Sequence, residues 1–449
     1  MAYRPWLVSE GSLVFEADSN WSSKYKDDRE LILNAPQQGA VAAVVAKPID
    51  EKNFKLPYLL VNDTFEAYET LAKASRQEYQ GKIIGITGSV GKTTTKEMLK
   101  TILSTNALVY ASHNKLNNYR GLVNNIAQCT PNVDYSIYEF GMAKIGSIAN
   151  KSLLAKPHIA IITDIQPDHL KHHKNIKSIA RTKAEIFTGM DKDGIAILNR
   201  DNEYYNYLKK KARSNGISHI VSFGRRKTAT IRLLNTRLSN QGSKVRIRVN
   251  QQELEYHLGA IGMSSVYNSL AAFAAVYALG LPLPIFINTL ENFTAPEQRG
   301  EQLNLKVNHK NIIVIDQRYN SNIASLKACA DNLVIMGKTP QIPHKTTFIL
   351  GDMEQLGKFA SELHEQAGKH LANCDIDQIL FFGEYSKELQ KGMNNKSNLI
   401  CFDSPDKLYN YFLEHLKENE IMTIKGSWSN DEFDNIIKSL RQLEYKETH

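Results

Sequence analysis

The segment Ile83-Ile-Gly-Ile-Thr-Gly-Ser-Val-Gly-Lys-Thr-Thr-Thr95 decides the fold of the middle of the chain. An apolar strand runs into a glycine-rich turn, and a helix is predicted to follow over Thr94–Thr101. The glycines let backbone N–H groups close around phosphate oxygens, and the N-terminus of the helix adds a favourable dipole. Lys92 can reach terminal phosphates, and Thr93 can bind Mg²⁺. The predicted nucleotide site comprises Gly88, Ser89, Val90, Gly91, Lys92, Thr93 and Thr94.

Apolar runs that alternate with helical patterns extend on both sides of this segment. Strands are predicted over Ser12–Glu16, Val41–Ala46, Tyr58–Val61, Tyr135–Glu139, His158–Thr163, Ile312–Ile315, Thr347–Leu350, Gln378–Phe382 and Ile421–Ile424. A helix is predicted over Thr64–Gln80, and the period-two alternation of Ser243–His257 predicts a hairpin with one solvated face. This order is typical of α/β domains with mostly parallel sheets.

The length of 449 residues corresponds to about three domains of ordinary size. We predict a small N-terminal α/β domain over residues 1–80 and a central phosphate-loop domain over residues 81–296. A Rossmann-like α/β domain is predicted over residues 297–449. Hydrophobic residues make up 42% and charged residues 23% of the chain, which excludes a disordered or fibrous protein.

Cysteine usage, hydropathy and charge narrow the class of protein further. Four cysteines without a Cys-x-x-Cys pair argue against a disulfide scaffold, and together with the N-terminal sequence they predict a cytoplasmic protein. The long apolar stretch Leu270–Ile287 is broken by glycine and proline, so we expect a buried helix ending near Leu279 and no membrane span. The net charge of +8 fits a phosphate-rich ligand or a solvated surface. Without a recognition module it does not indicate nucleic acid.

A series of motifs downstream of the phosphate loop resembles the Mur ligases, and the MurF branch is the best fit. The resemblance rests on the loop itself and, in chain order, on Leu116-Asn-Asn118, Tyr138-Glu-Phe-Gly141, Thr163-Asp-Ile-Gln-Pro-Asp-His-Leu170, Ala180-Arg-Thr-Lys-Ala-Glu-Ile-Phe187, Tyr319-Asn-Ser-Asn322, Leu350-Gly-Asp-Met-Glu-Gln-Leu-Gly357 and Lys425-Gly-Ser427. It implies ATP-driven amide formation. A substrate carboxylate takes the γ-phosphoryl group, and an incoming amine then displaces phosphate.

The resemblance assigns the ATP chemistry to a few residues. Lys92 would hold the γ-phosphate, and Thr93 and Glu139 would hold one Mg²⁺. His169 and a carbamylated Lys183 would hold a second Mg²⁺, because a carbamate turns a cationic lysine into an anionic oxygen ligand. The implied catalytic residues are Lys92, His169 and Lys183. Each of these residues also has an alternative interpretation when it is taken alone. Glu139 could be a capping or ion-pair carboxylate, and Lys183 could be a solvated lysine. His169 could be part of a surface histidine cluster or of a transition-metal site.

The resemblance also implies the binding residues. Asn268 would lie near the adenine, Arg299 would clamp phosphate through its planar fork, and Asp316 would contact the nucleotide. The implied partners are a small-molecule carboxylate and an amino acid or dipeptide amine. The residues expected to bind these substrates are Asn117, Asn118, Asn320, Asn322, Asp352, Lys425 and Ser427.

Several positions depart from the MurF pattern. No Asp-Ser-Arg motif for uridine precedes Ser12, Gly262-Met-Ser-Ser265 replaces Gly-x-His-Asn, Gln317 replaces an aspartate, and Trp428 replaces a basic residue. These departures favour a diverged ligase acting on a non-UDP substrate, in specialised peptide or amino-acid conjugate biosynthesis. The alternatives are a peptidoglycan ligase that adds D-alanyl-D-alanine to a UDP-linked tripeptide, and a nucleotide-binding protein without ligase activity.

Overall fold

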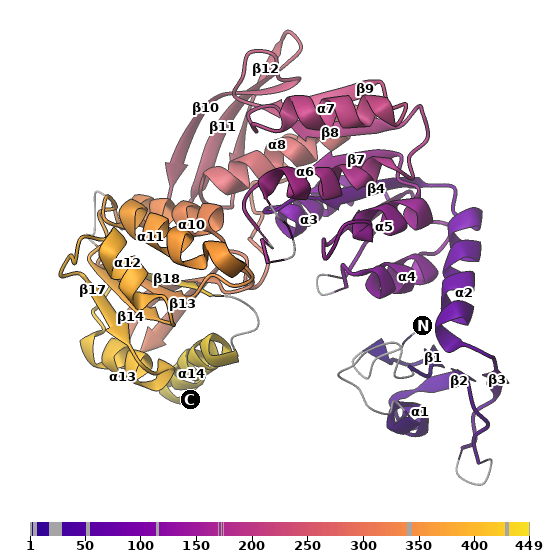
Figure 1. Cartoon of the computed structure of the whole chain (residues 1–449), viewed down its shortest axis with the longest axis horizontal. Coiled ribbons are helices and arrows are strands. Elements are labelled where there is room, and N and C mark those ends of the chain that lie inside the picture. Colours follow the sequence, from indigo (N-terminus) through magenta and orange to yellow (C-terminus); the bar gives the residue numbers. More distant parts are fainter. Residues whose placement is uncertain are drawn as a thin grey trace.

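The computed structural model consists of three α/β units that follow one another along the chain (Figure 1). It describes residues 2, 7–17, 29–50, 54–113, 116–168, 170–171, 173, 175–338, 344–426 and 431–448. Its sheets have three, nine and six strands, and each lies within one of the predicted residue ranges. The boundaries near residues 80 and 296 remain predictions.

The N-terminal unit is a small parallel sheet with strand order β1-β2-β3. Its elements are β1 (Ser12–Phe15), α1 (Arg29–Asn34), β2 (Ala40–Val45) and β3 (Tyr58–Leu60). Helix α2 (Thr64–Glu78) then leads to the central unit, and its first turn is capped by the Asp63 carboxylate, which accepts from the N–H groups of Phe65 and Glu66. All four elements predicted for this region are confirmed within one or two residues.

The central sheet has the strand order β12-β11-β10-β9-β8-β7-β4-β6-β5. Its strands are β4 (Lys82–Thr87), β5 (Val109–Ala111), β6 (Tyr135–Glu139), β7 (Ile159–Ile162), β8 (Ile195–Asn199), β9 (His219–Gly224), β10 (Ile231–Ser239), β11 (Gly242–Val249) and β12 (Gln252–Leu258). Strands β4 to β10 pair in parallel, whereas β10, β11 and β12 pair antiparallel. The predicted hairpin is therefore confirmed, and β10 extends it on one side.

Helices cover both faces of the central sheet. One face packs against α3 (Lys92–Leu103) and α8 (Met263–Ala278), and the other against α4 (Tyr119–Gln128), α5 (Ser147–Ala155), α6 (Ile176–Ala184) and α7 (Tyr205–Ser214). The buried helix predicted to end near Leu279 is α8, and the short α9 (Leu283–Phe286) follows it. Among the described residues, no helix has the length and apolarity needed to cross a membrane.

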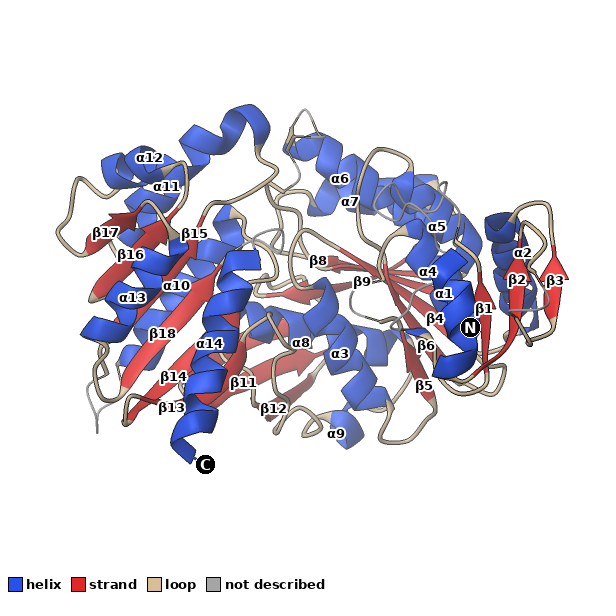
Figure 2. Cartoon of the chain, turned by 90° about the horizontal axis from the view of Figure 1, so that it is seen from below, coloured by secondary structure: helices blue, strands red, loops and turns tan. Residues whose placement is uncertain are grey.

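The C-terminal sheet has the strand order β13-β14-β18-β15-β16-β17, with β13 antiparallel to the rest. Its strands are β13 (Glu301–Val307), β14 (Lys310–Gln317), β15 (Thr346–Gly351), β16 (Gln378–Phe382), β17 (Leu399–Phe402) and β18 (Glu420–Lys425). As Figure 2 shows, helices lie on both sides of it. These are α10 (Ile323–Gly337), α11 (Ala360–Leu371) and α12 (Ser386–Gly392) on one face, and α13 (Pro405–His415) and α14 (Asp431–Thr448) on the other.

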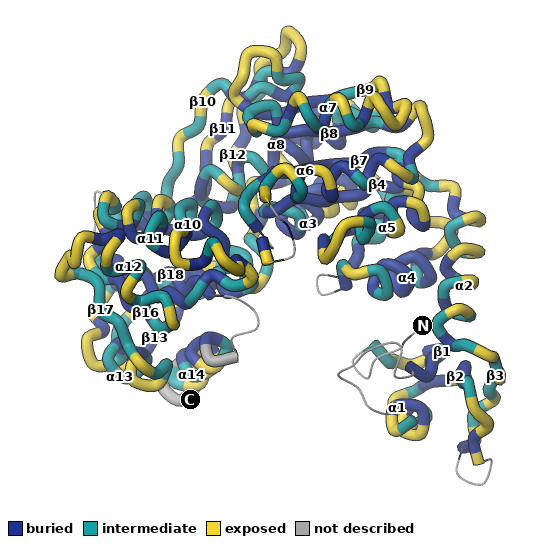
Figure 3. Tube along the Cα trace, in the orientation of Figure 1, coloured by how far each residue is buried: buried dark blue, intermediate teal, exposed yellow. Residues whose placement is uncertain are grey.

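The strands at the middle of the central and C-terminal sheets form the buried interior, whereas β3 and the strands β10 to β12 also carry exposed residues (Figure 3). Parallel strands present their carboxyl ends at a common edge, which is where open α/β sheets bind ligands. The central and C-terminal units are in contact, because the Lys171 N–H donates to the Gln355 carbonyl at 2.8 Å. A ligand site between these units is therefore expected from the topology.

Candidate active site between the central and C-terminal units

The phosphate loop connects β4 to α3 and has a backbone that only glycine fits at two positions. A Cβ added to Gly88 would lie 1.8 Å from the Thr163 hydroxyl, and one added to Gly91 would lie 2.2 Å from the Asn268 amide oxygen. Gly91 has φ +83° and caps α3, so the helix begins at Lys92. The predicted start at Thr94 was therefore two residues late, because the cap is a left-handed glycine and not a polar side chain.

The loop is held by the segment that follows β7. The Ser89 N–H donates to the Asp164 carbonyl at 2.9 Å, and its hydroxyl donates to the Gln166 carbonyl at 3.0 Å. The Lys92 amine donates to the Gly88 carbonyl at 2.8 Å, so it lies over its own loop. Burial lowers the pKa of Lys92. The loop is thus preformed, with its one charged side chain at the position where phosphates would bind.

Two oxygen ligands meet beside the loop. The Thr93 hydroxyl donates to the Glu139 carboxylate at 2.6 Å, and the Asn117 amide donates to the other oxygen of the same carboxylate at 3.0 Å. Burial alone would raise the pKa of Glu139, but Arg299, Lys92 and the Thr93 hydroxyl together lower it. Glu139 is therefore an anion at neutral pH although it is 1% exposed. An anionic carboxylate next to a hydroxyl is the donor set that Mg²⁺ prefers.

Lys183 lies on α6 and is 1% exposed. Burial and, to a smaller extent, nearby Lys92 lower the pKa of its amine to about 7, although Asp168 and Asp164 act in the opposite direction. A substantial part of the amine is therefore neutral at physiological pH. His169, which was predicted to act with Lys183, lies outside the described residues.

A cavity of about 670 Å³ lies between the carboxyl ends of the central and C-terminal sheets. Ten of the predicted site residues line it: Ser89, Val90, Gly91, Lys92, Thr94, Asn268, Arg299, Asn320, Asn322 and Lys425. The structure thus brings the phosphate loop and the C-terminal residues to the two walls of one cavity.

The C-terminal wall is built on the ends of β14 and β18. The Lys425 amine donates to the carbonyls of Gln317 and Asn320, and the first of these hydrogen bonds is 3.2 Å long. The Arg299 guanidinium lies 3.5 Å from the centre of the Tyr319 ring, and this contact holds the guanidinium in place in the lining of the cavity. Burial lowers the pKa of Lys425.

Among the predicted binding residues that do not line this cavity, three have side chains that contact structural partners. Asp316 is fully buried and pairs with the Arg318 guanidinium through two contacts of 2.8 Å. Asp352 accepts from the N–H groups that precede α12, at 2.7 Å from Glu384 and 3.3 Å from Tyr385.

Asn118 is the third of these residues. Its side chain caps α4 by accepting from the Gly121 N–H at 2.7 Å. Its neighbour Asn117 contacts Glu139, as described above, and also lies outside the lining of the cavity. Ser427, another predicted substrate residue, lies outside the described residues.

The cavity has a further polar wall that sequence reasoning missed. Asn199 ends β8, Asp201 and Asn202 follow it, and all three line the cavity together with Tyr267 of α8. The Tyr267 hydroxyl donates to the Asp201 carboxylate at 2.7 Å, and the Asn202 amide donates to Asp164. The sequence contains one signal for this wall, a run of polar residues directly after the apolar stretch at 195–198. That stretch was not predicted as a strand, so the polar residues after it were not assigned to the site.

Comparison with known proteins decides the family. The Mur ligase middle domain matches residues 86–276, and the Mur ligase glutamate ligase domain matches residues 299–428. A UDP-N-acetylmuramoyl-tripeptide–D-alanyl-D-alanine ligase from Rickettsia prowazekii is 30% identical over 421 residues, which are 94% of this chain and 90% of that protein. This chain belongs to the Mur ligase family. The family resemblance drawn from the ordered motifs is confirmed.

Other relatives of this Mur ligase extend the comparison. The ligase of the same name from Escherichia coli K12 is 28% identical over 360 residues, covering 80% of this chain and 76% of that one. A crystal structure of MurF from Acinetobacter baumannii has a TM-score of 0.83 and 25% identity, covering 98% of this chain and 93% of that one. MurF from Thermotoga maritima in complex with ADP shares the fold, with a TM-score of 0.79, 20% identity and coverage of 99% and 98%.

These matches confirm the predicted three-domain α/β fold and the class of enzyme. This Mur ligase is an ATP-dependent, ADP-forming enzyme that joins an acid to an amino acid or peptide amine. A nucleotide-binding protein without ligase activity is therefore no longer an alternative. Its MurF relatives favour the peptidoglycan reaction over the non-UDP substrate that the sequence departures favoured.

Proposed function

We propose that this Mur ligase joins D-alanyl-D-alanine to a UDP-N-acetylmuramoyl-tripeptide, the reaction for which its relatives are named. The observation that carries the proposal is the cavity whose walls come from the phosphate loop and from the C-terminal sheet. A ligase must hold ATP and an amine within reach of one carboxylate, and a cavity between two units meets that need. The similarity to D-alanyl-D-alanine ligases of this kind along 94% of the chain supports the choice of substrates.

The reaction would have two steps. A carboxylate oxygen of the tripeptide attacks the γ-phosphorus of ATP, the bond to the bridging oxygen breaks, and ADP leaves. The dipeptide nitrogen then attacks the acyl carbon, the carbon–oxygen bond to phosphate breaks, phosphate leaves, and the nitrogen loses a proton. Because both partners of the first step are anions, catalysis depends on positioning and on charge neutralisation.

The phosphate loop would serve the first step. Lys92 and the loop N–H groups would hold the γ-phosphate, and Thr93 and Glu139 would hold one Mg²⁺. The fit is supported by the two glycines that leave no room for a Cβ and by the 2.6 Å contact between the two oxygen ligands. Mg²⁺, when bound, would neutralise charge on the phosphates and the incoming carboxylate.

Lys183 would hold a second Mg²⁺ as a carbamate, together with His169. The support is a buried amine with a pKa of about 7, because only the neutral amine attacks CO₂. Protein equilibrated with ¹³C-bicarbonate should show a carbamate carbonyl signal by NMR. That signal should be missing in Lys183→Arg, and a wild-type spectrum without it would contradict the carbamate.

The remaining walls would bind the nucleotide and the amine. Asn268 and Arg299 would contact ATP, and Asn320, Asn322 and Lys425 would contact the dipeptide, with Ser427 as a predicted further contact. Asp316, Asp352 and Asn118 would act only through the backbone that they hold, because their side chains already bind structural partners. The four cysteines are free, and with the use of ATP this fits a cytoplasmic location.

The test is phosphate release from Mg-ATP in the presence of candidate substrates. We expect release only when UDP-N-acetylmuramoyl-tripeptide and D-alanyl-D-alanine are both present, together with an amide product whose mass is the sum of the two substrates less one water. The matched control omits the dipeptide, or replaces it by L-alanyl-L-alanine. Release that does not need the UDP-linked substrate would overturn this proposal.

A second candidate is a ligase for a carboxylate without UDP. The specific observation in its favour is that no Asp-Ser-Arg sequence precedes β1, which in MurF-type ligases is the place of the uridine motif. A panel of free amino acids and dipeptides in the same assay decides between the two. Phosphate release driven by members of that panel alone would support the second candidate.

A further inference from the structure

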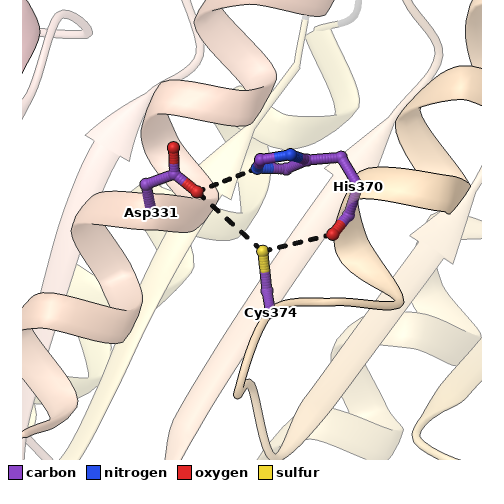
Figure 4. A group of neighbouring side chains, drawn as sticks. All are labelled: Asp331, His370 and Cys374. Carbon is purple, nitrogen blue, oxygen red and sulfur yellow. Dashed lines mark hydrogen bonds and ion pairs between the residues drawn. The ribbon is translucent and has the colours of Figure 1, made fainter.

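A group of metal-ligating side chains lies outside the cavity, on the C-terminal unit. Asp331 is on α10, His370 is in the last turn of α11, and Cys374 is in the turn that follows α11. Figure 4 shows the three side chains pointing toward one another from these elements. Within the described part of the chain, they are the only three His, Cys, Asp or Glu residues whose ligand atoms all lie within 4.8 Å of one another.

The distances within this group are close to those around a bound ion. The His370 ring nitrogen Nε2 lies 2.8 Å from Asp331 Oδ1, and the Cys374 sulfur lies 4.0 Å from the same oxygen. Zinc bonds of usual length in a tetrahedral arrangement separate neighbouring N, O and S ligand atoms by about 3.3–3.6 Å. Shifts of less than about 1 Å in these two distances, within the reach of side-chain rotations, would bring both pairs to the spacing of zinc ligands, and all three ligand atoms already lie within 4.8 Å of one another.

We propose that Asp331, His370 and Cys374 bind a divalent transition-metal ion of the zinc class, with one coordination position left to water. A carboxylate, an imidazole and a thiolate together suit Zn²⁺ or Co²⁺, whereas Mg²⁺ prefers oxygen ligands alone. The site is therefore separate in place and in chemistry from the Mg²⁺ ions of the ATP reaction, and the proposal does not rest on the proposed substrates.

Two features of the surroundings fit an ion at this position. His370 lies in the last turn of α11 and Cys374 in the turn directly after it, so one segment supplies two ligands, and Asp331 supplies the third from a different helix. Binding would break the S–H bond of Cys374 and form a sulfur–metal bond, and the proton would be released to solvent. The bound ion would join α10, whose N-cap residue Asn322 lines the cavity, to the end of α11.

The test is titration of tag-free protein with Co²⁺, followed by absorption spectroscopy. A cysteine thiolate bound to Co²⁺ gives a ligand-to-metal charge-transfer band that a histidine cluster cannot give. We expect this band to saturate at one ion per chain, to disappear on addition of Zn²⁺, and to resist a large excess of Mg²⁺. The band should be lost in Cys374→Ser. The dissociation constant should rise at least about tenfold in His370→Gln, since even indirect partners of metal ligands contribute that much.

Cys401→Ser is the matched control, because Cys401 is a partly buried cysteine of the same unit that contacts Gln390 and not this group. Its band should equal that of the wild type, and circular dichroism should confirm that all variants are folded. A wild-type protein without a thiolate band would overturn the proposal and leave Asp331 and His370 as a hydrogen-bonded pair. A band that persists in Cys374→Ser would overturn it as well.

Discussion

The two walls of the cavity are built in different ways. On the phosphate-loop wall, consecutive residues point into the cavity because the backbone itself is held, by glycines that exclude a Cβ and by hydrogen bonds to the segment after β7. On the C-terminal wall, the side chains of neighbouring residues point in different directions. Gln317 lines the cavity, whereas the preceding Asp316 is buried against Arg318.

This difference has a physical origin. In a loop whose N–H groups bind the ligand, position along the chain fixes the role of a residue almost completely. At the end of a strand, successive side chains point to opposite faces, so one neighbour reaches the ligand and the next reaches the interior. A residue assigned from a motif is therefore more secure on the first wall than on the second.

The largest effect is expected from the phosphate-loop wall. Lys92→Ala should lower kcat/KM for ATP by about 10³-fold, because the variant removes the loop cation while leaving the loop backbone in place. Lys100→Ala, an exposed lysine of the same helix, is the control and should keep full activity. Steady-state ADP release measures both. Near-normal activity in Lys92→Ala would contradict this assignment, because it would show that the preformed loop works without its lysine.

The adjacent pair on β14 tests the C-terminal wall. Asp316→Asn should lower the free energy of unfolding by about 3 kcal/mol, because it leaves the largely buried Arg318 guanidinium without its principal charge partner. Gln317→Ala should leave stability nearly unchanged and raise the KM of ATP or of the amine. Urea unfolding and steady-state kinetics distinguish the two. If Asp316→Asn instead changed only KM, Asp316 would be a ligand contact and the two walls would be alike.

The pH dependence of the free energy of unfolding tests whether the Lys183 amine has a lowered pKa. The pKa of the Lys183 amine is about 7 in the folded chain against 10.5 for an ordinary lysine. At pH values between these two, the amine is protonated in the unfolded chain and largely neutral in the folded chain. Stability relative to Lys183→Met should therefore rise with pH above 7, by up to roughly 1.4 kcal/mol per pH unit. Urea midpoints in buffer free of CO₂ and Mg²⁺ measure this. A difference that stays constant from pH 7 to 9 would mean that the amine titrates normally.

The smallest effect concerns two neighbouring asparagines on the central unit. Asn118→Ala should cost about 1 kcal/mol of stability through the lost cap of α4 and should leave kcat nearly unchanged. Asn117→Ala should lower kcat, because its amide positions the Glu139 carboxylate. Thermal unfolding and single-turnover assays on both variants give the contrast. Equal losses of kcat would show that Asn118 also serves the substrate.

Much of the fold could be predicted because the relevant signals are local. Strands β6 and β16 have the predicted bounds, and the Ser243–His257 hairpin alternates with period two as expected. Strands β8, β9 and β10 were missed, although β8 carries the polar residues at 199–202 to the cavity. Strand β8 is short and buried on both faces, so its sequence has no alternation and periodicity alone does not identify it.

The sequence by itself determined the phosphate loop, the order of the elements and the family, because each depends on residues close together in the chain or on motifs in a fixed order. The tertiary structure decided which side chains reach the cavity. Asn268 meets Gly91 only because α8 packs beside α3, and the Asp331 group exists only because α10 lies against α11. Contacts between distant segments depend on how the helices pack on their sheets, and no single stretch of sequence contains that information.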